Sequence, residues 1–391
     1  MKKVILAFYL LLSTFSLSAQ TAKREIVVAP VLSDFPVEFC LLTHGDKQFV
    51  AYYAPDHQMM VASRNINEDK WLFQPLPSKI GWDGHNSIAM KVDSDNQIHL
   101  SGNMHVAPLM YLRTTKPLDI TSFEEINYMV GKDEMKATYP AFMNGPDNAF
   151  IYHYRDGGSG DGNEIFNVYD VKTQTWSRLL DKPLTDGKGL RNAYMSGPSL
   201  GPDNYYHLVW VWRDSYHCET NNHLSYARSR NLKDWESVDG KRVELPITIE
   251  QEELWVDPIP VKAGLINGGA QAGFDNENRL LITYHKFDKN GNNLVKVNYS
   301  HVKYGEGYWL VDENTLEVVK TVTVKSPSAK ETPMDKPALS MIKKTLNDCG
   351  KGFKGKKFRL EWETLPQNRD TMRTGVRVEP TILKVIEETI Q

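Results

Sequence analysis

Cysteine is scarce in this sequence, and the number of cysteines is odd. The 391 residues contain three of them, Cys40, Cys218 and Cys349. Three thiols allow at most one intramolecular disulfide and leave at least one thiol that is free or bound to a metal. A scaffold organised by several disulfides is therefore excluded.

An excess of charge of one sign is also lacking. The formal net charge is −3 at pH 7. This value gives no argument for binding to nucleic acid or to an anionic membrane surface, so we expect neither as a partner. An acidic substrate would have to be attracted by a local basic cleft. We expect the chain to be a monomer.

A long apolar run is present only at the N-terminus. Met1–Lys3 is basic, Val4–Leu12 is apolar and Ser13–Ala19 is rich in small residues. This order is typical of a signal peptide, so we predict that residues 1–19 are removed and that the protein is secreted or periplasmic. An N-terminal core helix is the alternative, but the run carries no helix-capping signals.

The rest of the chain, 20–391, has no linker rich in proline, glycine or serine that would divide it. We therefore predict a single domain. Globular cores usually split before they reach this length, and closed or repeating architectures such as propellers escape the limit. Helical periodicity is nearly absent. Only Leu339–Leu346 and Ile382–Ile390 suggest short helices, and the second could instead be a strand.

A polar turn followed by a short β-rich run recurs along the sequence. Its aspartates are Asp46, Asp95, Asp147, Asp203 and Asp275, which lie 49, 52, 56 and 72 residues apart. We assign these residues to turns, because aspartate and asparagine cap turn backbones and tolerate left-handed conformations. A period near fifty residues fits a propeller blade of four strands.

This period predicts the fold class. About seven units fit into the mature chain, so we expect an all-β, single-domain, seven-bladed β-propeller of four-stranded antiparallel blades. Closing the ring would require an N-terminal strand, Glu25–Val31, to pair with the C-terminal blade. A second recurring sequence pattern, an extended segment that leads to a tryptophan, supports the repeat. This pattern covers Met60–Trp71, Phe166–Trp176, Leu224–Trp235 and Val297–Trp309.

Some polar residues have no evident role in the turns. The first of them form two groups that each contain a histidine and an asparagine. Asp83-Gly84-His85-Asn86 is followed by Gly102-Asn103-Met104-His105. Both groups flank the strands of one predicted blade and could meet at one mouth of the ring. Imidazole carries protons near neutral pH, and asparagine amides donate to carboxylate or hydroxyl oxygens. The alternative is that these are buried turn residues.

A second group contains Tyr139 and Arg155. Arg155 leads into a loop with glycines at 157, 158 and 160, where the backbone can approach a ligand while the guanidinium binds a carboxylate in two-pronged fashion. Alternatively, Arg155 pairs with Asp156 or Asp161 to stabilise the loop.

A third group contains Tyr194, His207 and Arg213, which we expect near the substrate. His207 alternates with aliphatic residues on a predicted strand, which by itself favours a histidine of the core. Cys218 with His223, His217 or Glu219 could hold a structural zinc ion, although the spacing matches no standard site. A structural calcium ion is also possible, whereas the chemistry itself needs no cofactor.

Taken together, these motifs resemble the BNR-repeat propeller family that contains the secreted ulvan lyases, over about residues 35–380. The residues that carry the resemblance are Asp83-Gly84-His85-Asn86, Gly102-Asn103-Met104-His105, Tyr154-Arg155-Asp156-Gly157, Trp210, Trp212, Arg213 and Asn222-His223-Leu224-Ser225-Tyr226. The resemblance implies cleavage of an acidic, sulfated polysaccharide by β-elimination at a uronic acid.

The resemblance also implies roles for single residues. Tyr139 corresponds to the tyrosine that transfers a proton, and Arg155 to the arginine that neutralises the uronate carboxylate. The histidines that line the cleft correspond to His85, His105 and His207, and Tyr194 to a further substrate contact. Asn86, Asn103 and Arg213 are further candidates for substrate binding.

The chemistry explains these residue types. The proton at C5 is weakly acidic while the carboxylate is charged, so a cation must stabilise the enolate-like transition state. A tyrosine whose pKa is lowered by cationic neighbours could be the base. Alternatively, His85 or His105 is the base and Tyr139 only the acid.

Two other functions stay open. A sialidase-like glycoside hydrolase would need two carboxylates facing each other across the cleft, and the candidates are Asp83, Asp156, Asp161, Glu164 and Asp214. A carbohydrate-binding propeller without activity would need only aromatic platforms.

Overall fold

The computed structural model describes residues 23–287, 294–301, 305–312, 318–325, 341–350, 352–366, 372 and 374–389. The predicted signal peptide lies outside these residues. Within them, the chain is all-β and its strands pair antiparallel, with short 3-10 helices between some of them. These helices are η1 (Ile120–Ser122), η2 (Pro146–Asn148), η3 (Cys218–Thr220) and η4 (Glu252–Leu254). None of the helices in the described part is long and apolar enough to span a membrane.

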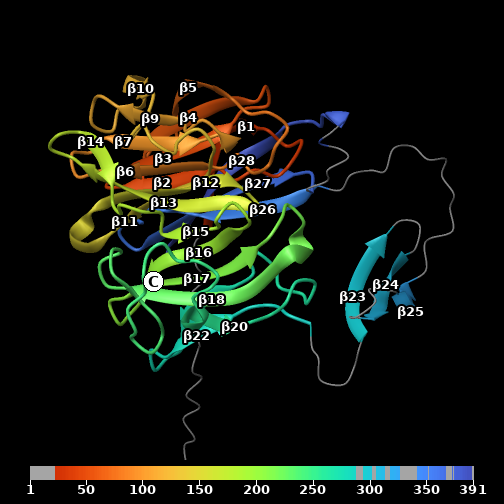
Figure 1. The fold of residues 1–391 in the computed structure, drawn as a ribbon. Helices are drawn as coiled ribbons and strands as arrows, with labels where there is room; N and C mark the ends of the chain where they lie inside the picture. Colours follow the sequence, from red (N-terminus) through yellow and green to blue (C-terminus); the bar gives the residue numbers. More distant parts are fainter. Residues whose placement is uncertain are drawn as a thin grey trace, which may run out of the picture.

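Two four-stranded sheets follow each other in the first third of the chain (Figure 1). Each is a meander of neighbouring antiparallel strands, apart from β8, which joins the next sheet. The first sheet consists of β2 (Cys40–His44), β3 (Lys47–Tyr53), β4 (Gln58–Asn65) and β5 (Leu72–Lys79). The second consists of β6 (Ile88–Val92), β7 (Ile98–Gly102), β9 (Tyr111–Thr114) and β10 (Phe123–Glu125).

Two larger sheets occupy the middle of the chain. Their central strands are β11 (Ala137–Asn144), β12 (Phe150–Gly158) and β13 (Asp161–Asp170) in one, and β16 (Asn192–Leu200), β17 (Tyr206–Arg213) and β18 (Asn221–Ser229) in the other. The first also holds β8 (His105–Ala107), β14 (Thr175–Arg178) and β15 (Thr185–Asp186), and the second holds β19 (Trp235–Glu236) and β20 (Trp255–Asp257).

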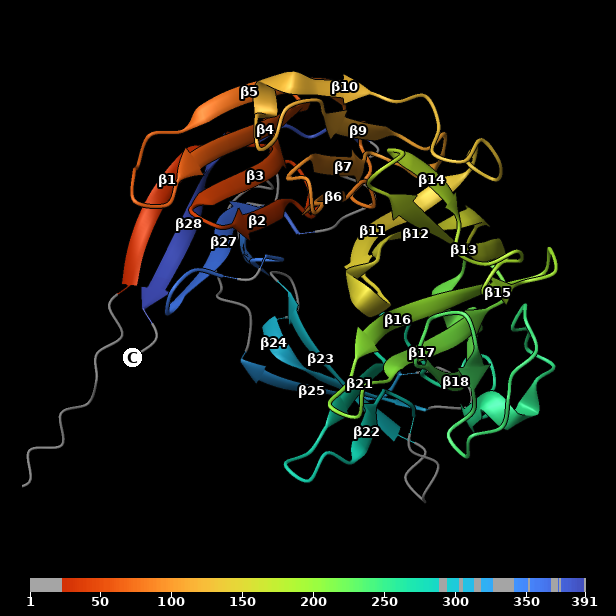
Figure 2. The same ribbon diagram turned by 90° about the vertical axis from the view of Figure 1, so that its left-hand side faces the viewer.

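Two smaller sheets come next. One pairs β21 (Gln271–Phe274) with β22 (Leu280–Thr283), and the other joins β23 (Leu294–His301), β24 (Gly305–Asp312) and β25 (Val318–Lys325). Figure 2 shows the sheets from β1 to β22 following one another along an arc, whereas Figure 1 shows β23–β25 standing apart from them.

The two ends of the chain share the remaining sheet. β1 (Lys23–Val31) pairs antiparallel with β28 (Thr381–Thr389), followed by β27 (Lys356–Thr364) and β26 (Ile342–Asn347). This pairing confirms the prediction that an N-terminal strand joins the C-terminal sheet. The helix expected over Leu339–Leu346 is wrong where the structure describes it, because pairing with β27 overrides the local pattern. The second segment is the strand β28.

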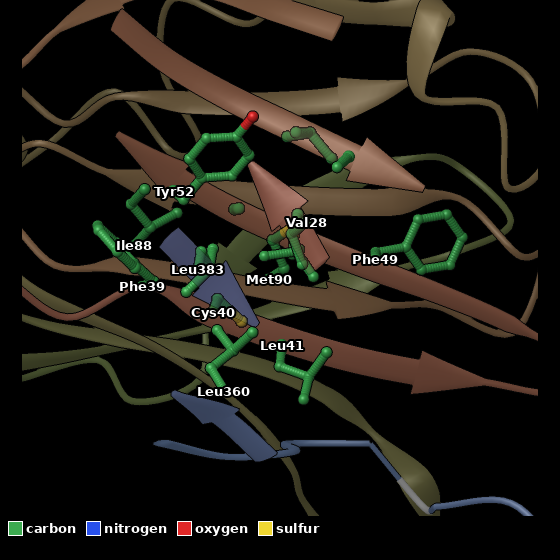
Figure 3. Packing of buried hydrophobic residues seen from close by; sticks show 14 of the residues in the cluster. Val28, Phe39, Cys40, Leu41, Phe49, Tyr52, Ile88, Met90, Leu360 and Leu383 are labelled. Atoms are coloured by element: carbon green, nitrogen blue, oxygen red, sulfur yellow. The ribbon is translucent and has the colours of Figure 1, made fainter. Parts of the chain in front are cut away.

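A large apolar core joins the sheet of the chain ends to β2–β5. Val28, Phe39, Leu41, Leu360 and Leu383 are buried in it and lie close together in Figure 3. Because these residues come from both ends of the chain, their burial links closure of the end sheet to the packing of its neighbour.

The recurring polar turns behave as the sequence predicts. Asn96, Asn148 and Asn204 all have positive φ, and the Oδ1 atom of Asp203 accepts from the backbone N–H of Tyr205 at 3.2 Å. These side chains therefore serve the turns and not the chemistry.

A feature that the sequence did not reveal is a repeated Asp-His-Tyr relay. In one sheet, His99 Nε2 donates to Asp93 at 3.1 Å while its Nδ1 accepts from the Tyr111 hydroxyl at 2.6 Å. His207 makes the same two contacts, with Asp203 at 2.9 Å and the Tyr226 hydroxyl at 2.7 Å. Each relay fastens a turn to two neighbouring strands.

We predict that His99→Leu lowers the free energy of unfolding by about 3 kcal/mol, because it leaves Asp93 and Tyr111 buried without this partner. Urea unfolding measures the effect. The control is Asp95→Ala on the exposed part of the same turn, which should change the free energy by less than about 0.5 kcal/mol. Equal effects of the two substitutions would contradict a stabilising relay.

Candidate active site

The carboxylate of Asp83 binds two histidines at once. Its Oδ1 atom accepts from His85 Nδ1 at 2.6 Å, and its Oδ2 atom accepts from His105 Nδ1 at 2.6 Å. The two imidazole rings stack with their centroids 4.2 Å apart. Since Nδ1 is the donor in both rings, the neutral form of each carries its lone pair on Nε2, where it can accept a proton.

The hydrogen bonds determine the charge of Asp83. Burial tends to raise its pKa, but the hydrogen bonds from His105 and His85 outweigh burial and hold the pKa well below its usual range. The carboxylate is therefore ionised at neutral pH and stabilises positive charge on either imidazole.

The loops that carry these residues are fixed by close packing. A Cβ atom on Gly84 would collide with the carbonyl oxygen of Pro36, so the Asp83 loop lies directly on the segment after β1. The side-chain amide of Asn103 donates to Ser78 Oγ at 2.8 Å and to Lys79 O at 2.9 Å. We predicted that Asn103 binds substrate, but its side-chain amide stabilises the turn before β8.

Asn86 is almost entirely buried in the same loop, and its backbone carbonyl accepts from the Tyr53 hydroxyl at 2.8 Å. Its Oδ1 atom has no hydrogen-bond partner among the described residues.

Tyr139 projects from an irregular point of β11. The pairing of β11 with β12 shifts between Thr138 and Ala141, and Tyr139 itself has a φ of 57°, a strained conformation for a bulky residue. Its ring lies 6.4 Å from that of His85 and 6.4 Å from that of Tyr194. The irregularity thus presents Tyr139 to the histidine pair.

Burial raises the pKa of Tyr139, and this effect outweighs the opposing charges of Arg155 and Arg213. The expectation that cationic neighbours would lower this pKa is therefore wrong. The hydroxyl keeps its proton at neutral pH, which suits a general acid.

Arg155 is fully buried behind Tyr139. Its guanidinium carbon lies 4.9 Å from the centre of the Tyr139 ring, its Nε donates to Gly157 O at 3.1 Å, and its Nη1 donates to the Tyr194 hydroxyl at 3.4 Å. Its Nη2 atom has no hydrogen-bond partner within the described chain. Neither Asp156 nor Asp161 forms an ion pair with it, so the alternative that Arg155 pairs with one of these aspartates is wrong.

Glu164 lies opposite Arg155 in the pairing of β12 with β13. Burial raises its pKa to about 7, against the lowering effect of Arg155. In the sequence, Glu164 is only one of several acids that could serve a hydrolase.

Two cavities meet at Tyr139. One of ≈ 260 Å³ is lined by Glu38, His85, Ser87, Tyr139 and Lys344 among others. The other, of ≈ 650 Å³, is also lined by Glu38 and Tyr139, and includes Glu164, Asn192 and Tyr194. A chain-like ligand could therefore extend to both sides of Tyr139. Sequence reasoning missed Glu38, because this residue does not stand in a recognisable motif.

Tyr194 lines the second cavity, and Arg213 packs against the ring of Tyr194. The Tyr194 hydroxyl donates to Ser159 Oγ at 2.9 Å, and the Arg213 guanidinium carbon lies 5.0 Å from the Tyr194 ring centre. Arg213 Nε donates to Ser215 O at 2.9 Å, so its side chain is largely held by its own loop.

His207 does not join this group. It is 2% exposed, and both ring nitrogens are used in the relay described above. The prediction that His207 lines the cleft is therefore wrong, and the alternation of its strand indicated its core position correctly.

Among the described residues, the structure does not bring Cys218 and His223 together with a third possible zinc ligand. His223 Nδ1 contacts Asn222 Oδ1 at 2.7 Å and its ring packs on Trp255, while Cys218 is exposed in η3. Within the described residues, the group of three that could hold a metal ion is Asp83, His85 and His105. A zinc or calcium ion elsewhere stays a prediction.

Known proteins resemble this chain in sequence and in fold. An ulvan lyase (short isoform) of Alteromonas sp. (strain LOR) is 30% identical over 131 residues, which is 31% of this chain and 25% of the relative. An ulvan lyase of the same strain is 22% identical over 318 residues, 66% of this chain and 64% of the relative. The chain thus spans less than two thirds of the length of either relative.

A solved structure has the same fold. The crystal structure of the polysaccharide lyase Uly1 matches with a TM-score of 0.58 and 15% identity, covering 90% of both chains. The sequence profile described as BNR repeat-containing family member matches residues 47–315, more than half of the chain. This chain belongs to the BNR repeat-containing family.

Proposed function

We propose that this protein is a polysaccharide lyase that cleaves ulvan by β-elimination at a 4-linked glucuronic or iduronic acid. The observation that carries the proposal is the grouping of the Asp83-linked histidine pair, the protonated Tyr139 and the buried guanidinium of Arg155. The relatives named ulvan lyases support the choice of substrate.

Arg155 binds the uronate carboxylate. Its unpartnered Nη2 atom is a donor already desolvated by the protein, so an incoming carboxylate supplies the partner that it lacks. Neutralising the carboxylate increases the acidity of the C5 proton and stabilises the enolate-like transition state.

One of the two histidines removes the C5 proton through Nε2, and Asp83 stabilises the resulting imidazolium. The electron pair of the C5–H bond forms the C4–C5 double bond, and the bond between C4 and its oxygen breaks. Tyr139 donates its proton to that leaving oxygen. The products are a 4,5-unsaturated uronate and a new hydroxyl end.

The scaffold for this chemistry is a seven-bladed propeller formed by residues 20–391 as a single domain, with residues 1–19 removed on export. Seven described sheets and the pairing of β1 with β28 support this arrangement. In the closed ring, β23–β25 would complete the arc between β22 and β26. We propose that the enzyme acts as a secreted or periplasmic monomer.

A glycoside hydrolase is the second candidate. Glu38 and Glu164 line the same cavity, and the raised pKa of Glu164 is a property of general acids in hydrolases. The products discriminate between the two functions, because a hydrolase forms new reducing ends without an unsaturated uronate.

We expect the purified protein to release unsaturated uronate from ulvan, measured by its ultraviolet absorbance. Tyr139→Phe and Arg155→Ala should each lower kcat/KM by about 10²-fold or more, since they remove the acid and the carboxylate partner. Tyr128→Phe, at a tyrosine that is 62% exposed, is the matched control and should retain full activity. Reducing ends without unsaturated product would favour the hydrolase.

We expect Asp83→Asn to lower kcat by about 10²-fold or more while the fold is kept, because an amide cannot accept from both Nδ1–H groups and no longer fixes their tautomer. Circular dichroism monitors the fold. An unchanged kcat would exclude this positioning role.

Glu164 should produce an alkaline limb in the pH profile. Below about pH 7 the carboxyl is neutral, and above it the carboxylate competes for Arg155, so kcat/KM should fall. Glu164→Gln should remove this fall.

Because the folded-state pKa of Glu164 is raised, the free energy of unfolding should also decline as pH rises from the ordinary pKa of 4.5 to about 7. This decline should disappear in Glu164→Gln. Identical pH profiles of the parent protein and of Glu164→Gln would contradict this role of Glu164.

A further inference from the structure

We propose that Cys40 and Cys349 form a disulfide that fastens the sheet of the chain ends to β2–β5. Their Sγ atoms lie 3.6 Å apart, although the two residues are separated by 309 positions in the sequence. Cys40 begins β2, and Cys349 follows β26 by two residues. The proposal concerns a covalent link that includes none of the proposed catalytic residues, and it does not depend on the proposed activity.

The backbones around the two cysteines are already held together. The Cys349 N–H donates to Leu41 O at 3.0 Å, and Asp348 Oδ1 accepts from the Thr43 N–H at 2.9 Å. A Cβ atom on Gly350 would collide with Thr43, so the turn after β26 lies directly on β2. Formation of an S–S bond of about 2.0 Å therefore requires side-chain rotation and only small backbone movements.

The two cysteines differ in their exposure to solvent, and this difference favours stepwise oxidation. Cys40 is buried in the core shown in Figure 3, whereas Cys349 is exposed and lines a cavity of ≈ 570 Å³ together with His44, Lys91 and Phe150. An oxidant can reach Cys349 first, and Cys40 is then the neighbouring thiol that resolves the intermediate. Cys218 lies in η3, in a different sheet region, and remains the odd thiol.

The reaction is a thiol-disulfide exchange with a protein or small-molecule disulfide as oxidant. The Cys349 thiolate attacks the oxidant, forms a mixed disulfide and releases one thiol. The Cys40 thiolate then attacks the Cys349 sulfur, forms the Cys40–Cys349 bond and releases the second thiol. Two S–H bonds are lost from the protein and two are gained by the reduced oxidant. The exported location that we propose would supply such oxidants.

The cross-link stabilises the closure of the fold. It encloses the chain from β2 to β26, and a long covalent loop restricts the unfolded chain most strongly. The two sheets that it joins share the core of Val28, Phe39 and Leu360. Separation of the chain ends from β2–β5 would therefore be opposed by a covalent bond as well as by burial.

The test is a thiol count on the full chain after incubation with glutathione disulfide, followed by denaturation without reductant, alkylation with iodoacetamide and mass spectrometry. We expect one alkylated thiol, at Cys218, and a linked pair of peptides containing Cys40 and Cys349. Cys218→Ser should show no alkylated thiol. Alkylation of all three cysteines, or a link that includes Cys218, would overturn the proposal.

Thermal unfolding gives an independent measurement. A reductant should lower the Tm of the oxidised protein by several degrees and leave that of Cys349→Ser unchanged. Cys349→Ser replaces the exposed partner, so it keeps the core intact, and Cys218→Ser is the matched control that should respond to reductant like the parent protein. An equal response of Cys349→Ser and the parent would also overturn the proposal.

Discussion

The antiparallel pairing of β1 with β28 is the interaction on which the arrangement of this protein depends. It places residues from both chain ends in one sheet, and the apolar face of that sheet packs on β2–β5. The segment after β1 then carries Pro36 against Gly84, so the loop with Asp83 and His85 is positioned by the closure of the chain. Loss of this pairing would remove the support of the candidate site as well as part of the core.

The candidate site combines groups whose charges are set by burial and by their neighbours. Hydrogen bonds keep Asp83 ionised, burial keeps the Tyr139 hydroxyl protonated, and the guanidinium of Arg155 has an unused donor. A base supported by a carboxylate, an acid and a carboxylate-binding cation are the groups that an elimination requires. Asp83 comes from the loop between β5 and β6, whereas Tyr139 and Arg155 come from β11 and β12 of one sheet, and the irregularity in β11 presents Tyr139 to the histidines.

Four histidines of this protein represent two structural kinds. His99 and His207 use both ring nitrogens in buried relays, so they stabilise turns and have no free nitrogen for chemistry. His85 and His105 use Nδ1 to bind Asp83 and are partly exposed. The same residue type thus serves stability or proton transfer according to the partners that surround it, which a single sequence does not display.

The sequence by itself determined the all-β class, the polar turns and the joining of the chain ends, because these follow from short-range patterns and a repeat of nearly constant length. It also singled out His85, His105, Tyr139 and Arg155, which the structure brings together. Tertiary structure alone decided that His207 belongs to the core, that Tyr139 has a raised pKa and that Cys40 meets Cys349. These properties depend on burial and on contacts between residues far apart in the chain, and neither is encoded in local spacing.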